Sequence, residues 1–327
     1  MKYFRTVPSL PESFNVTSAP TVKISSYEQV IKDYLIKYPG TTVIREKAVS
    51  ILREYLNRSG IIIQDKFYVR AGSSKRIELK LYNDIVYELV VSVSGTCIGK
   101  CDISLRLVDE QNKLVLIKSS SGSSFISGRY NYLRITFKLY PLETGGTYYL
   151  LLDNSYSVIT SKNVYVTVRA YYPSYAFDDE YFKIFAVGHW ISNSIRYISD
   201  PFIENEYIAT PDETLRVKAG DCDDFAVLLA VLYRSIGLNA MVGLIDTDGD
   251  NKIDHATALV YLNKDTLDVL NGISKWASVL GVEVEIISYF DKDNGILLIV
   301  DPAMATDKDN PWHVPHRPYR LIKTINP

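Results

Sequence analysis

Helical periodicity marks two stretches near the N-terminus of the chain. Residues 27–38 place their apolar side chains on one face and end before a Pro-Gly pair, and residues 42–57 repeat the pattern. The two stretches predict a helical hairpin. Residues 1–26 contain prolines, serines and threonines without apolar periodicity, which predicts an extended arm. We therefore expect residues 1–60 to form an arm followed by a helical hairpin.

The hydrophobic period changes to two between residues 61 and 172. Apolar and polar residues alternate most clearly in four segments, which are 77–81, 103–107, 133–139 and 164–168. Each segment is typical of a half-buried strand. Turn residues separate these strands, so residues 61–172 are predicted to form an antiparallel β-sandwich.

A third domain is predicted over residues 173–327, where helices and strands mix. The first two predicted helices cover 181–198 and 221–236, and the second is apolar nearly all round, as expected of a central helix. Strands are expected at about 239–245, 255–262, 283–289 and 295–301, with a helix at about 264–280. The predicted class is α+β, with the central helix packed against an antiparallel sheet.

Composition and charge narrow the classes of function. The chain has 327 residues, 47% of them hydrophobic and 23% charged, as in ordinary globular proteins. Its net charge of -2 provides no general attraction for nucleic acid. The apolar runs are too short for a membrane span, and the N-terminus lacks the apolar core of a secretory signal. We therefore expect a cytoplasmic protein.

Glutamine is scarce, with only three residues against 25 tyrosines. Scarce amides are typical of thermophile proteins, so the composition favours a thermophile.

The candidate chemistry centres on Cys222, within the sequence Ala-Gly-Asp-Cys-Asp-Asp at the predicted start of a helix. Backbone N–H groups at a helix N-terminus favour the reactive thiolate, whereas the neighbouring aspartates oppose it. A protonated imidazole would offset the aspartates, and His255 is the candidate. Asp301, which ends an apolar strand, would orient that imidazole.

These motifs resemble the transglutaminase-like superfamily of papain-related folds. Three separated motifs, at 211–224, 255–260 and 298–303, occur in the family's order. The resemblance implies Cys222 as nucleophile, His255 as base and Asp301 as orienting acid in acyl transfer through a thioester.

Two positions depart from the family pattern. Tyr207 stands where relatives often have Trp, and Ala256 stands where many have an aromatic residue. Both departures bear on substrate preference. The candidates for contacts to the oxyanion or the substrate are Tyr207, Gly220 and Asp221, beside the backbone N–H of Cys222.

The β-sandwich region carries a resemblance of its own. Residues 145–168 run from a Gly-Tyr strand through an Asp-Asn-Ser turn into a Ser-Lys-x-Val strand, which is similar to the end of a GOLD domain. The resemblance extends over residues 61–172 and implies a module that binds a protein partner or packs against one.

An acidic loop precedes His255 in the sequence. Asp246, Asp248, Asp250 and Asp254 occupy positions 1, 3, 5 and 9 of a loop like those that bind calcium. The loop lacks the usual glycine at position 6 and the usual glutamate at position 12. The alternative is a charged hairpin tip without an ion. If calcium binds, it would position the adjacent His255.

The remaining cysteines and histidines suggest no metal centre. Cys97 and Cys101 are close enough in sequence to form a disulfide, and the alternative is two free thiols. Zinc would require two further ligands. His189, His313 and His316 have no cysteine or carboxylate cluster near them in sequence.

The leading interpretation is a cysteine-dependent peptidase or amidase that acts on a protein or peptide and requires no cofactor, with calcium as an option. The first alternative is a crosslinking transglutaminase, because water or an amine can resolve the same thioester. The second is an inactive scaffold whose sandwich binds a protein partner, and the third is a calcium-dependent adhesion module.

Overall fold

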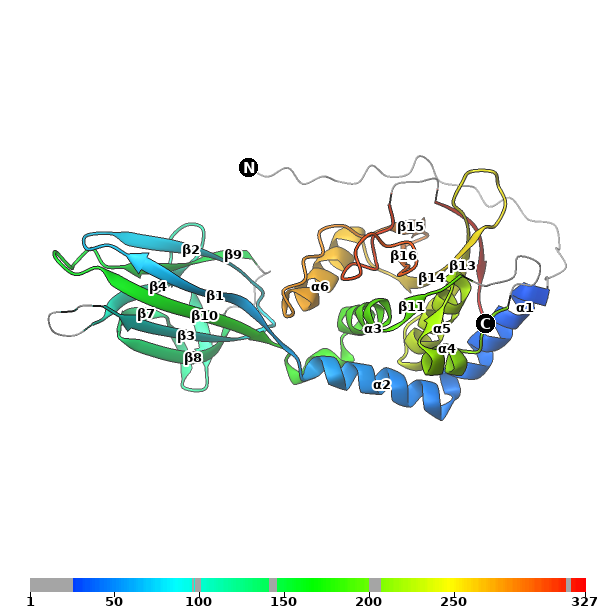
Figure 1. The fold of residues 1–327 in the computed structure, drawn as a ribbon, viewed down its shortest axis with the longest axis horizontal. Coiled ribbons are helices and arrows are strands. Elements are labelled where there is room, and N and C mark those ends of the chain that lie inside the picture. Colours follow the sequence, from blue (N-terminus) through cyan, green and yellow to red (C-terminus); the bar gives the residue numbers. More distant parts are fainter. Residues whose placement is uncertain (1–25, 96, 98–100, 141–145, 200–206, 316–318) are drawn as a thin grey trace. The chain divides into compact units, whose positions relative to one another are not determined.

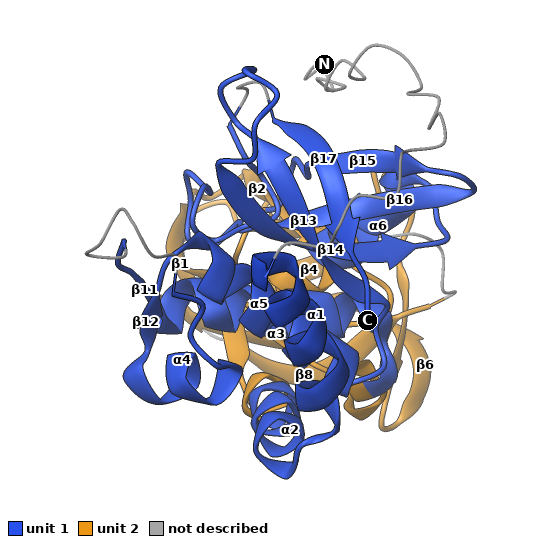
Figure 2. Ribbon diagram, turned by 90° about the vertical axis from the view of Figure 1, so that its right-hand side faces the viewer, with its two compact units in different colours: residues 1–53, 178–274, 284–327 blue, residues 54–177, 275–283 orange. Residues whose placement is uncertain are grey.

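A computed structural model describes residues 26–95, 97, 101–140, 146–199, 207–315 and 319–327. The expected N-terminal arm, up to residue 25, and His316 lie outside them. The chain divides into two compact units (Figure 2). Unit 1 comprises Met1–Arg53, Asp178–Ser274 and Val284–Pro327, and unit 2 comprises Glu54–Phe177 and Lys275–Glu283. The predicted mixed α+β class is confirmed.

Unit 2 is built on two antiparallel sheets. The first has the order β1-β10-β3-β8-β5-β6 and the second β2-β9-β4-β7. Alternate residues of these strands are buried, as the period of two predicts. The strands are β1 Ser59–Val69, β2 Ser74–Leu81, β3 Val86–Ser94, β4 Ile103–Val108, β5 Leu116–Ser119, β6 Gly122–Phe125, β7 Ser127–Tyr130, β8 Tyr132–Leu139, β9 Gly146–Asp153 and β10 Lys162–Tyr171.

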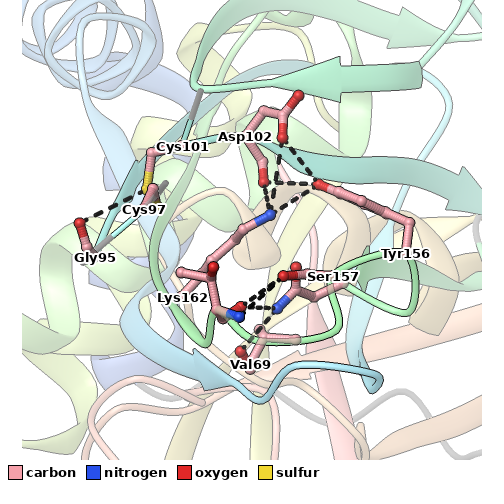
Figure 3. The surroundings of a disulfide bond; sticks show 10 residues. Val69, Gly95, Cys97, Cys101, Asp102, Tyr156, Ser157 and Lys162 are labelled. Atoms are coloured by element: carbon pink, nitrogen blue, oxygen red, sulfur yellow. Dashed lines mark hydrogen bonds and ion pairs between the residues drawn. A yellow bond between two sulfur atoms is a disulfide. The ribbon is translucent and has the colours of Figure 1, made fainter. Parts of the chain in front are cut away.

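A disulfide joins Cys97 and Cys101 between β3 and β4 (Figure 3). Next to it, the backbone carbonyl of Asp102 accepts hydrogen bonds from the Lys162 ammonium and from the Tyr156 hydroxyl, the latter at 2.7 Å. Lys162 is only 3% exposed. An unpaired ammonium would be costly to bury. The hydrogen bonds of Lys162 next to the disulfide therefore stabilise this part of unit 2.

Unit 1 contains most of the helices. They are α1 Ser26–Lys37, α2 Thr42–Leu56, α3 Glu180–Ser194, α4 Pro211–Val217, α5 Cys222–Ser235 and α6 Thr266–Ser278, of which α2 and α6 continue into unit 2. Short 3-10 turns cover Tyr38–Gly40 and Ser174–Asp178. α1 packs against α5 and against strand β17 (Arg320–Ile325), and Glu28 of α1 pairs with Lys323 of β17 at 2.8 Å. The hairpin arrangement expected for α1 and α2 is not confirmed.

A five-stranded antiparallel sheet, in the order β15-β16-β14-β13-β17, lies against α5 in unit 1 (Figure 1). Its strands are β13 Ala240–Asp246, β14 His255–Leu262, β15 Tyr289–Lys292, β16 Gly295–Val300 and β17 Arg320–Ile325. A further parallel pair consists of β11 Arg196–Tyr197 and β12 Ala219–Gly220. Nearly every residue of β13, β14 and α5 is buried, so the core of unit 1 lies between this sheet and the central helix.

The strand predicted over residues 283–289 is wrong. Only Tyr289 of that stretch belongs to a strand, β15, which continues to Lys292. Two backbone groups before it bond away from β16, because the Val284 carbonyl accepts from the Ser274 hydroxyl and the Ser288 N–H donates to the Trp312 carbonyl. Of the groups before β15, the Ser288 carbonyl still accepts from the Ile299 N–H of β16. Apolar residues in this stretch are therefore buried without being in a strand.

Candidate active site

Cys222 is the first residue of α5, and Asp221 is the N-cap of this helix. The cysteine is partly exposed and is the free cysteine of the chain. N–H groups at the start of a helix lack intrahelical partners and carry partial positive charge, which favours a thiolate at this position. Since α5 packs against β13 and β14, the sulfur is held by a rigid element.

Asp224 fixes the chain that leads into this helix. Its carboxylate accepts hydrogen bonds from the Ala209 N–H at 2.8 Å and the Asp221 N–H at 3.4 Å. Gly220 makes room for it, because a Cβ atom at position 220 would lie 2.6 Å from the Cβ of Asp224. Of the predicted oxyanion candidates, Gly220 and Asp221 therefore lie directly beside Cys222 and are held by Asp224.

Asp223 changes the electrostatics expected from the sequence. Its side chain is 5% exposed. Burial, together with the hydrogen bond and the charge of Asp221, raises the pKa of Asp223 to about 10. Asp223 is therefore protonated at neutral pH and adds no negative charge beside the thiol.

His255 begins β14 and is 8% exposed. Its Nε2–H donates to Oδ2 of Asp301 at 2.6 Å, and a second hydrogen bond links the imidazole with the Cys222 thiol. Burial lowers the pKa of His255, but the hydrogen bonds with Asp301 and Cys222 outweigh it and raise this pKa to about 10. The imidazole is therefore a cation at neutral pH.

Asp301 follows β16 and is 2% exposed. Its backbone N–H donates to the Pro311 carbonyl at 2.8 Å, and its Oδ1 accepts from the Met304 N–H at 3.1 Å. Both bonds fix the carboxylate at the end of a buried strand. The structure thus brings Cys222, His255 and Asp301 together in the order expected from the sequence.

Tyr319 also belongs to this cluster, although the sequence does not predict it as a site residue. Its hydroxyl donates to Oδ2 of Asp301 at 2.5 Å. Nothing in the sequence distinguishes it from the other tyrosines of the chain, which number 25 in all. Only the placement of β17 beside β13 carries it to the site.

Tyr207, the remaining oxyanion or substrate candidate, is 58% exposed. Its hydroxyl donates to Glu213 of α4 at 2.7 Å. α4 begins at the N-cap Thr210, whose hydroxyl accepts from the Glu213 N–H. A contact of Tyr207 with substrate stays a prediction.

The acidic loop between β13 and β14 gathers three of its four aspartates. Ligand atoms of Asp246, Asp248 and Asp254 lie within 4.8 Å of one another. Asp250 pairs instead with Lys252, at 2.6 Å. Oxygen donors so arranged fit a hard cation, but calcium binding stays a prediction.

Two further histidines, His189 and His313, lie in the described ranges. His189 of α3 pairs with Asp309 at 3.0 Å and is 8% exposed. Within the described residues, the acidic groups that could hold a metal contain neither His189 nor His313.

Comparisons with known proteins bear on this site. No match was found among curated proteins. The solved structure of a candidate cysteine protease from Cytophaga hutchinsonii is 17% identical, with coverage of 62% of this chain and 75% of that chain and a TM-score of 0.21. A candidate protease from Parabacteroides distasonis is 11% identical, with coverage of 62% and 65% and a TM-score of 0.23.

A third solved structure, of endo-1,4-beta-D-xylanase modules from Clostridium thermocellum, is 12% identical, with coverage of 42% and 33% and a TM-score of 0.21. None of these three similarities is close enough to support an argument about function. The GOLD resemblance of residues 61–172 is not confirmed by the comparisons. No described helix is long and apolar enough to cross a membrane. Residues 174–271, which include Cys222 and His255 and end before Asp301, match the family model of the transglutaminase-like superfamily.

Proposed function

We propose that the protein is a cysteine-dependent acyl-transfer enzyme that hydrolyses a peptide or side-chain amide. In this proposal Cys222 is the nucleophile, His255 the acid and base, and Asp301 the group that orients His255. The observation that carries it is the hydrogen-bonded series of thiol, imidazole and buried carboxylate. The transglutaminase-like match of residues 174–271 supports the same reaction class.

The first half of the reaction forms a thioester. The Cys222 thiolate attacks the amide carbonyl carbon, and the carbonyl oxygen becomes an oxyanion that accepts from backbone N–H groups at the start of α5. When the intermediate collapses, the C–N bond breaks and the His255 imidazolium gives its proton to the leaving amine. The products of this step are the free amine and an S-acyl Cys222.

The second half restores the enzyme. Neutral His255 takes a proton from water as the water oxygen attacks the thioester, and the C–S bond breaks to release a carboxylic acid. An amine in place of water would give a crosslink, which is the alternative product of the same intermediate.

The test is the pH dependence of iodoacetamide labelling at Cys222, located by mass spectrometry from pH 5 to 9. Because its hydrogen bonds with Asp301 and Cys222 raise the pKa of His255, a protonated imidazole faces the sulfur in this proposal. We expect fast labelling below pH 7 in the wild type. His255→Ala should slow it by about ten- to a hundredfold at pH 6, where an ordinary thiol is almost entirely protonated.

His313→Ala is the matched control, since it removes a histidine of unit 1 outside the series. Its labelling should equal that of the wild type. The proposal would be contradicted if the wild type were labelled slowly, with a pH midpoint near that of an ordinary thiol, ~8.5, and if His255→Ala left the rate unchanged. That result would favour the inactive scaffold.

The product separates hydrolysis from crosslinking. Casein incubated with the wild type should yield new carboxylates, with Cys222→Ser as the inactive control. Incorporation of a fluorescent primary amine at a rate above that of hydrolysis would replace the hydrolase with the transglutaminase alternative.

A further inference from the structure

Asp301 has a second partner beside His255. Its Oδ2, which accepts from His255 Nε2 at 2.6 Å, also accepts from the Tyr319 hydroxyl at 2.5 Å. Tyr319 is 7% exposed and Asp301 2% exposed, so water does not substitute for either group. The carboxylate oxygen that faces the imidazole is thus shared between two donors.

The ring of Tyr319 is held on two sides. It stacks on Phe290 with the ring centroids 6.3 Å apart and the planes at 20°. Against His255 it is edge-on, with centroids 6.0 Å apart and planes at 65°. Because both contacts fix the ring, the direction of its hydroxyl is set independently of Asp301.

The hydroxyl acts on Asp301 as a permanent donor. Burial and the charge of Asp301 raise the pKa of Tyr319 well above its ordinary value, so the phenol keeps its proton throughout the working range of a cysteine enzyme. A buried carboxylate needs such donors, because an oxygen left without them carries a large desolvation penalty. Besides His255, the Met304 N–H supplies a donor at Oδ1 and Tyr319 supplies one at Oδ2.

We propose that Tyr319 is a positioning residue that holds the Asp301 carboxylate in place, so that the imidazolium of His255 stays aimed at Cys222. This inference rests on the function proposed above. Without the hydroxyl, Asp301 would turn more freely, and its hydrogen bond would hold the His255 imidazolium less firmly toward Cys222. A less firmly held imidazolium disfavours the thiolate.

The test compares Tyr319→Phe with the wild type by iodoacetamide labelling of Cys222 from pH 5 to 9. Phenylalanine keeps the ring and its packing on Phe290, and removes the hydroxyl with its hydrogen bonds to Asp301 and Thr257. We expect the pH midpoint of labelling to rise, with about three- to tenfold slower labelling at a pH below the midpoint. Tyr233, another buried tyrosine of unit 1, provides the control. Its hydroxyl also donates a hydrogen bond, but to the Ile184 carbonyl, at 2.9 Å. Tyr233→Phe should leave the midpoint unchanged.

A double-variant cycle identifies the route of the effect. If Tyr319 acts through Asp301, Tyr319→Phe should change nothing further once Asp301→Asn is present. Additive shifts of the midpoint would overturn the proposal. Should Tyr319→Phe fail to fold, 3-fluorotyrosine at position 319 gives the opposite readout. Its more acidic hydroxyl is a stronger donor and should lower the midpoint.

The outcomes separate the two proposals. If His255→Ala is labelled at the same rate as the wild type, the proposed function fails, and this inference fails with it. If labelling responds to His255→Ala but Tyr319→Phe keeps the wild-type midpoint, the function stands and the role of Tyr319 is wrong.

Discussion

Asp223 shows how a single buried acid alters the environment of a nucleophile. A run of three aspartates around Cys222 would place several negative charges beside the thiol if all were ionised. Asp224 is engaged by two backbone N–H groups, and Asp223 is protonated. The remaining negative charge close to the sulfur is therefore smaller than the sequence suggests, and His255 has less to offset.

The proton on Asp223 predicts how stability depends on pH. The pKa of Asp223 is raised from 3.8 to about 10 by folding, so its stabilising contribution is complete below about pH 4 and is lost as pH rises toward 10. Asp223→Asn keeps a neutral donor and does not titrate. We expect its melting temperature to exceed that of the wild type by a few degrees at pH 9, and by less at pH 5.

The control for this prediction is Asp291→Asn, which changes an exposed aspartate of β15 in the same unit. Its melting temperature should follow the wild type at both values of pH. An advantage of Asp223→Asn that is equal at pH 5 and pH 9 would mean that Asp223 is ionised in the folded protein.

The elements of the site differ in how well the sequence predicts them. α5 is apolar nearly all round and begins at an aspartate cap, and both features are local. β17 is different, because its burial is uneven and its place beside β13 depends on contacts between distant parts of the chain. The sequence therefore indicates Cys222, His255 and Asp301 through motifs on strong elements, and it gives no sign of Tyr319, which a weak element brings in.

In the loop between β13 and β14, the arrangement of the aspartates differs from the one that the sequence predicts. Asp246 is completely buried, and its carboxylate accepts from the backbone N–H groups of Asp248, Gly249 and Asn251. The sequence pattern treats four aspartates as equivalent ligands. The structure gathers three, because Asp250 turns toward Lys252.

Calcium binding by this loop predicts a shift in melting temperature. If calcium binds the folded state at about a hundred times its dissociation constant, it adds roughly 2.7 kcal/mol, or several degrees for a unit of this size. We expect this rise in the wild type and its loss in Asp248→Asn. Asp250→Asn, as the matched control, should retain the rise. A melting temperature that is the same with calcium and with a chelator would exclude calcium from the loop.

At the scale of the whole molecule, the chain separates its candidate chemistry from its disulfide. Cys222, His255, Asp301 and Tyr319 all belong to unit 1, and Cys97 and Cys101 belong to unit 2. Disulfides are rare in the cytoplasm of mesophiles and common in intracellular proteins of hyperthermophiles. The expectation of a cytoplasmic location therefore depends on the expectation of a thermophile.

Removal of the disulfide should weaken unit 2 and leave the site intact. Closing so short a loop restricts the unfolded chain by an amount worth about 2 kcal/mol. We expect the double variant Cys97→Ser, Cys101→Ser to melt several degrees lower than the wild type. Its labelling profile at Cys222 should be unchanged, and a shifted pH midpoint would show that unit 2 influences the site.

The interrupted path of the chain has a consequence for biosynthesis. Unit 1 is assembled from three segments, and the last of them carries both Tyr319 and β17. A ribosome adds about 5 to 20 residues per second, so Cys222 is synthesised several seconds before the strand that completes its sheet. During those seconds the cysteine lies in an unfinished unit, without the Asp301–Tyr319 pair behind His255. The nascent chain should therefore carry an ordinary thiol, and the reactive form would arise only after residue 325 has been added.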